Sequence, residues 1–112
     1  MALTMLQTVS CYRRHASRLQ AGEGVYALWS CGSREELSRV RDLSFSGMFI
    51  ESPIEANIGA PVKLNFLAPE GQIRASAVVR HVISGEGLGL KFIAINDHDC
   101  HHLVGLMKRL RN

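Results

Sequence analysis

The sequence has no long apolar run and contains few cysteines, prolines and aromatic residues. Its 112 residues include 3 cysteines, 3 prolines, 4 phenylalanines, 2 tyrosines and 1 tryptophan. No stretch approaches the roughly 20 consecutive apolar residues that a membrane-spanning helix needs, so membrane insertion is not expected. The N-terminus has no basic segment ahead of its short, broken apolar stretch, which argues against a secretory signal. We therefore expect a cytoplasmic protein.

The cysteines form no recognisable pair. Cys11, Cys31 and Cys100 are far apart in the sequence, and no CxxC spacing occurs. Disulfide frameworks and cysteine-based zinc sites are built from even or closely spaced sets of cysteines. The sequence therefore predicts three reduced thiols.

The excess of positive charge is small, but it is concentrated near the N-terminus. Thirteen Lys and Arg residues face ten Asp and Glu residues, giving a net charge of +3. Such a small excess is only a weak indication of an anionic partner. Its distribution is more informative, because Arg13, Arg14 and Arg18 all precede the first acidic residue, Glu23. The unmatched positive charge thus lies near the N-terminus.

The pattern of apolar residues predicts one all-β domain that spans residues 1–112. Val62, Leu64 and Phe66 alternate with polar residues, as expected for a strand with one buried face. We expect an N-terminal tail over 1–24, a barrel over 25–95 and a C-terminal α-helix over 97–111. The strands are expected near residues 25–29, 37–43, 48–51, 62–66, 73–82 and 88–92, with a polar turn over 32–36. About six short strands followed by one amphipathic helix favour an antiparallel β-barrel.

Two short motifs stand out. Arg14 and Arg18 form an RxxxR motif, and the segment from Asp42 to Gly47 fits [D/N]xSxxG, with Ser44 at its serine position. The two motifs are separated by residues 19–41. Both motifs, in this order and in a short β-rich chain, resemble the PilZ family. The likeness runs from about residue 11 to the C-terminal helix, and it implies a PilZ-like β-barrel.

The resemblance also implies a ligand, the bacterial second messenger cyclic di-GMP. The arginine segment of this family wraps the ligand, so Arg14 and Arg18 are expected to contact guanine and phosphate. An arginine at the position of Arg13 accompanies binding of an intercalated ligand dimer in the family. The planar guanidinium fork suits phosphate oxygens and the O6/N7 edge of guanine.

The second motif is expected to supply the barrel side of the same site. The carboxylate of Asp42 can accept hydrogen bonds from the N1–H and N2–H groups of guanine. Asp42 and Ser44 share one face of an extended segment because side chains alternate with a period of two. Gly47 lets a ligand or the arginine segment approach the backbone closely. No further cofactor is expected.

The function implied is that of a receptor and adaptor, and not of an enzyme. Ligand binding would order the arginine segment and change a surface that an effector protein recognises. Motility, adhesion and exopolysaccharide production are the processes that the resemblance suggests. The alternative is a protein-interaction barrel of the same fold without a nucleotide ligand.

The remaining candidate sites have simpler explanations. His98 and His102 are four residues apart and could chelate a metal on a helix, but the sequence spacing shows no further ligand. Lys108, Arg109 and Arg111 could contact nucleic acid or lipid, yet cations are favoured at a helix C-terminus in any case. A small RNA-binding barrel would need exposed stacking aromatics, so no nucleic-acid polymer is expected as a partner.

Overall fold

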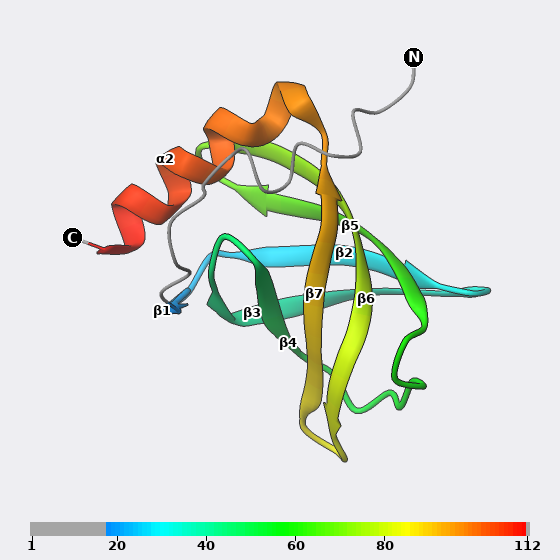
Figure 1. The fold of residues 1–112 in the computed structure, drawn as a ribbon. Coiled ribbons are helices and arrows are strands. Elements are labelled where there is room, and N and C mark those ends of the chain that lie inside the picture. The colour runs from blue at the N-terminus through cyan, green and yellow to red at the C-terminus, as the bar shows by residue number, and fades with distance from the viewer. Residues whose placement is uncertain (1–17, 112) are drawn as a thin grey trace.

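The chain folds into a six-stranded antiparallel β-barrel with one additional short strand and a C-terminal helix (Figure 1). The computed structural model describes residues 18–111, so Arg13 and Arg14 lie outside the described residues. The elements are β1 (Leu19–Gln20), β2 (Tyr26–Cys31), β3 (Arg34–Leu43), β4 (Gly47–Glu51), β5 (Pro61–Ala68), β6 (Gly71–Ile83), β7 (Gly87–Ile95), the 3₁₀-helix η2 (Asp97–Asp99) and α2 (Cys100–Arg111).

The strands follow the order β1-β3-β2-β5-β6-β7-β4, and a further pairing between β3 and β4 closes the barrel. All pairings are antiparallel. The small strand β1 stands outside this ring and pairs with the end of β3. It lies within the segment that the sequence suggested as a tail. The predicted barrel with a C-terminal helix is confirmed, and closure removes the unpaired edges that an open sheet would expose.

Strand β3 is longer than the sequence pattern suggested. The polar stretch expected as a turn over 32–36 is a turn only at Gly32 and Ser33, and β3 already begins at Arg34. Gly32 has a φ of 63° at the first central position of this two-residue turn, where hairpins favour glycine. The exposed, charged start of β3 lacks apolar alternation, which is why the pattern missed it.

The barrel interior and the inner face of α2 form one apolar core. Apolar residues of β5, β6 and β7 alternate inward, as the sequence predicted for β5, and α2 contributes from the end of the barrel that it covers (Figure 1). The largest side chains that are fully buried include Trp29, Phe66, Ile73, Leu88, Leu103 and Leu106. Trp29 keeps its indole N–H satisfied, because Nε1 donates to Oγ of Ser38 at 2.9 Å. Helix α2 thus covers one end of a single apolar core.

The junction between β7 and α2 is fixed by polar contacts. Asn96 caps η2, since its Oδ1 accepts a hydrogen bond from the N–H of His98 at 3.0 Å. Asp99, only 3% exposed, accepts three hydrogen bonds from Arg74 of β6. Two come from the guanidinium and one from the backbone N–H, at 2.9–3.1 Å. These contacts hold the start of α2 against the barrel.

One expectation about the cysteines is wrong. Cys31 is a free thiol, as predicted. Cys100 is disulfide-bonded, contrary to the prediction of three reduced thiols. Cys11 lies outside the described residues. Spacing along the sequence does not report the distance between cysteine side chains in a fold, and a disulfide depends only on that distance and on geometry.

Among residues 18–111, no helix combines the length and the apolar character needed to cross a bilayer.

We expect Asp99→Ala to lower the free energy of unfolding by about 2 kcal/mol, because the backbone N–H and the guanidinium of Arg74 lose their acceptor. Burial alone would raise the pKa of Asp99, but hydrogen bonds from Arg74 outweigh it and hold the pKa below its usual value. This contribution is therefore present above the unfolded-state pKa and is lost as the pH falls through the lower, folded-state pKa. Urea denaturation between neutral pH and pH about 2 measures both effects.

The matched control is Asp97→Ala, which removes an exposed carboxylate two residues away. Asp97→Ala should leave the acid sensitivity of the protein unchanged. Equal stability of Asp99→Ala and the wild type at neutral pH would contradict the assigned role of this carboxylate.

Candidate functional site

The structure brings together the second arginine of RxxxR and the [D/N]xSxxG segment. Nε of Arg18 donates to Oδ1 of Asp42 at 2.8 Å, and Nη1 of Arg18 lies 3.5 Å from Oγ of Ser44. The two motifs are 24 residues apart in sequence at this contact. One guanidinium therefore spans the two polar side chains of the second motif.

Strand β1 explains why Arg18 lies there. Leu19 pairs with Leu43 and Gln20 pairs with Asp42, so the residue just before β1 is carried to the end of β3. The N–H of Ala21 also donates to the carbonyl of Arg41 at 2.9 Å, which extends this attachment. A two-residue strand without any apolar pattern is invisible to sequence periodicity. It nevertheless positions the described end of the arginine segment.

Ser44 and Gly47 shape the turn between β3 and β4. Ser44 is completely buried, and its Oγ accepts hydrogen bonds from the N–H groups of Ser46 and Gly47 at 3.1 and 3.2 Å. The N–H of Ser44 donates to the carbonyl of Gly47 at 2.8 Å, and the carbonyl of Ser46 accepts from Phe92 of β7. The turn is thereby tied both to itself and to the neighbouring strand.

Gly47 is required by the close approach of β4 to β7. A Cβ atom at this position would collide with the backbone carbonyl oxygen of Leu90, which cannot move without disturbing β7. Asp42 differs from its two partners in the motif, because its side chain is 26% exposed. The motif thus divides into Ser44 and Gly47, which hold the turn, and Asp42, which presents a carboxylate to solvent.

A pocket of about 190 Å³ opens beside this turn. We call it the cationic pocket; it is lined by Arg18, Ser46, Gly47, Arg80, His81, Gly89, Leu90 and Lys91. None of these residues carries a negative charge, and three are arginine or lysine. Sequence reasoning placed Arg18 and Gly47 at the site but missed Arg80, His81 and Lys91. Their sequence signal was an Arg-His pair and a lysine on the last two predicted strands.

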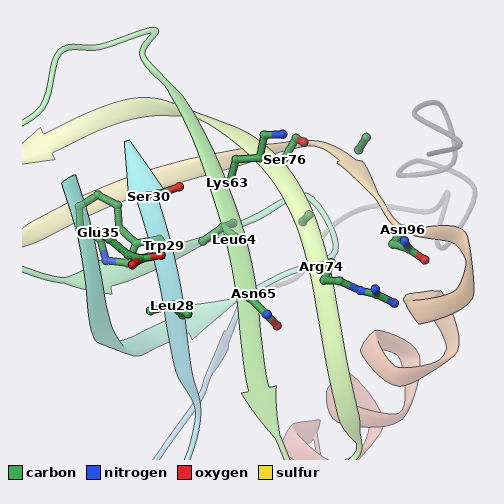
Figure 2. Close-up of a pocket in the computed structure, with 12 residues that line it drawn as sticks. Leu28, Trp29, Ser30, Glu35, Lys63, Leu64, Asn65, Arg74, Ser76 and Asn96 are labelled. Carbon is green, nitrogen blue, oxygen red and sulfur yellow. The ribbon is translucent and has the colours of Figure 1, made fainter. Parts of the chain in front are cut away.

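A second pocket, of about 460 Å³, lies elsewhere on the barrel wall (Figure 2). Its lining comes mainly from β2, β5 and β6 and includes Trp29, Lys63, Asn65 and Arg74. None of the predicted ligand residues that the structure describes lines it. Arg74 is engaged by Asp99, and Oδ1 of Asn65 is buried without a hydrogen-bond partner in the part of the chain that the structure describes. The larger pocket is therefore separate from the motif site.

The histidines near the C-terminal helix do not assemble a metal site within the described range. His102 packs over Gly71, and its Nδ1 lies 2.8 Å from the carbonyl oxygen of Gln72. Over residues 18–111, no three His, Cys, Asp or Glu side chains gather in a way that could hold an ion. The basic end of α2 is partly engaged, because Arg109 forms an ion pair with Glu70.

The comparison with known protein families identifies one family. The sequence model of the PilZ domain matches residues 12–109. Two solved proteins have a similar fold. One is the Bacillus subtilis inhibitor of motility MotI/DgrA, with a TM-score of 0.71, 20% identity, and coverage of 88% of this chain and 51% of that chain. The other is K. pneumonia MrkH, whose apo structure gives a TM-score of 0.68, 20% identity, and coverage of 88% and 52%.

A structure of the MrkH–c-di-GMP complex also matches, with a TM-score of 0.63, 18% identity, and coverage of 88% of this chain and 52% of that chain. The chain thus spans about half the length of the solved proteins that it resembles. No curated protein sequence matches it.

We expect Gly47→Ala to destabilise the fold by about 1–3 kcal/mol, because the added methyl group must displace the backbone of β7. The measurement is urea denaturation without any ligand. Gly105→Ala in α2 is the control, since the added methyl group would meet only the side chain of Glu70, at 3.4 Å. That change should leave stability unchanged or raise it by up to about 1 kcal/mol. A Gly47→Ala protein as stable as the wild type would contradict the packing role of this glycine.

Proposed function

The chain belongs to the PilZ domain family, and we propose that it is a receptor for cyclic di-GMP. The observation that carries this proposal is the contact between Arg18 and Asp42, which joins the two ligand motifs at one place on the barrel. We propose Arg18, Asp42, Ser44 and Gly47 as the described part of the site. The structure of MrkH with c-di-GMP supports the same ligand for this chain.

The chemistry of the ligand fits these side chains. Cyclic di-GMP carries two phosphates and two guanines. A guanine presents N1–H and N2–H donors on one edge, and a partly exposed carboxylate such as Asp42 can accept both. Its other edge, O6 and N7, matches the guanidinium fork of an arginine. Arg18 and Asp42 can therefore recognise opposite edges of guanine.

In the free protein, Arg18 donates to the same carboxylate that a guanine would use. The guanidinium and the guanine edge both present N–H donors, so the ligand exchanges one partner of Asp42 for another. The side chains of Arg18 and Asp42 are 48% and 26% exposed, and ion pairs of this kind contribute little stability. The exchange is therefore inexpensive, and it frees Arg18 to bind phosphate or the O6/N7 edge.

We propose that Arg13 and Arg14, outside the described residues, complete the site from the other side. Strand β1 attaches the chain to β3 immediately after Arg18, and Arg18 lines the cationic pocket. Ligand binding would order this arginine segment over the barrel. The changed surface would then be recognised by an effector protein in the cytoplasm, with motility, adhesion or exopolysaccharide production as the process controlled. The role is that of an adaptor and not of an enzyme.

Isothermal titration calorimetry with cyclic di-GMP tests the proposal. We expect saturable binding at roughly micromolar concentration, since a handful of charge-assisted hydrogen bonds supports this after ordering costs. Asp42→Ala, Arg18→Ala and Arg14→Ala should each weaken binding by about tenfold or more. Thermal melting should show that Arg18→Ala and Asp42→Ala remain folded, because their contact is largely exposed.

Arg34→Ala is the matched control for the arginine variants. Arg34 is exposed and lies at the opposite end of β3 from Asp42, so its substitution removes the same charge far from the site. The molar ratio of bound ligand tests whether Arg13 supports a ligand dimer. An absence of binding by the wild type would overturn the receptor proposal and favour a ligand-free interaction barrel.

A further inference from the structure

The far wall of the cationic pocket is built by an irregularity in strand β6. Val79 pairs with Leu90 and His81 pairs with Gly89, so Arg80 is an additional residue on β6 at this point. In a regular strand Arg80 and His81 would point to opposite faces. Here both are exposed, while Val79 remains buried. The bulge therefore turns two adjacent side chains outward, and bulges often re-aim side chains beside binding sites.

The polar side chains of this wall are unpaired in the part of the chain that the structure describes. Within residues 18–111, the side chains of Arg80, His81 and Lys91 form no hydrogen bond or ion pair. The neighbouring wall of the barrel is different, because Arg39 and Arg41 both pair with Glu51. The fold thus neutralises one group of arginines and leaves a second group of cations without a counter-charge. Like charges gathered on one pocket favour an anionic occupant.

Gly89 gives His81 a specific position. A Cβ atom at Gly89 would collide with Nε2 and Cδ2 of His81, so the imidazole rests directly against the backbone of β7. The residue is also exposed and lines the cationic pocket. A flat ring supported on one side and open on the other can stack on a nucleobase. Position 89 must therefore be a glycine for the imidazole of His81 to lie there.

We infer that Arg80, His81 and Lys91 form a second wall of the ligand site, opposite the Asp42 side. Arg80 and Lys91 bind a phosphate of cyclic di-GMP, and the imidazole of His81 stacks on the adjacent guanine. This inference rests on the proposed receptor function and extends it to three residues outside the two motifs. It also explains the bulge in β6 and the presence of a glycine at position 89.

Matched charge-removal variants test the phosphate contacts. We expect Arg80→Ala and Lys91→Ala to weaken cyclic di-GMP binding by about tenfold each, measured by calorimetry. The controls are Arg34→Ala and Lys63→Ala, which remove the same charges from exposed positions on other parts of the barrel. Because the net charge changes equally, a purely long-range effect would weaken binding in all four variants. A loss confined to Arg80 and Lys91 supports a direct contact.

Stacking by His81 is tested by replacement with residues that keep or remove the ring. His81→Ala should weaken binding several-fold, and His81→Phe should restore it, because a phenyl ring can also stack on guanine. Gly89→Ala should weaken binding by displacing the imidazole, but it should add little in the His81→Ala background. Thermal melting of each variant separates a loss of fold from a loss of contact.

The two proposals fail in different ways. A wild-type protein that binds no cyclic di-GMP overturns both. Binding that depends on Asp42 but is unchanged in the Arg80, His81 and Lys91 variants overturns this inference alone. Equal weakening by Lys91→Ala and Lys63→Ala overturns the phosphate contact as well, since it would show only the loss of net positive charge.

Discussion

The whole structure depends on the close approach of β4 to β7 at Gly47. Strand β4 is only five residues long, yet it pairs with both β3 and β7 and so closes the barrel. Closure requires that nothing stand between Gly47 and the backbone carbonyl of Leu90. The hydrogen bonds of Ser44 hold the turn that brings Gly47 there. The segment that resembles a ligand motif is therefore also the element that completes the fold.

The arrangement of charge follows from this closure. On one wall, Arg39 and Arg41 share Glu51, and Arg41 also lies over the ring of Phe49 at 4.5 Å. The positive charge of these two arginines is therefore balanced by Glu51. Across β4 and β7, Arg80 and Lys91 have no such partner within residues 18–111, and Arg18 is paired through an exposed contact. The barrel thus separates arginines that stabilise its surface from cations that remain available to an anion.

Much of the barrel could be predicted from the sequence, because burial on one face of a strand leaves a visible alternation. Val62, Leu64 and Phe66 are buried as the pattern indicated. The pairing of β1 with β3 could not be predicted, since a two-residue strand has no period. The bulge at Arg80 was equally invisible, because its cause is the register between two strands and not a local sequence preference. Asp42 was predicted as a ligand residue through its motif, whereas His81 and Lys91, which line the cationic pocket, belong to no motif.

The double use of the turn has a consequence for how related sequences diverge. Ser44 is buried and Gly47 is confined by a backbone oxygen, so both would be retained by any descendant that keeps this barrel. Asp42 is partly exposed and makes no comparable contribution to closure. Under the proposed receptor function, a lineage that lost the ligand would be free to change the aspartate and the arginines first. Its sequence would then keep the serine and the glycine because the barrel needs them. The presence of these two residues alone would be a poor marker of ligand binding.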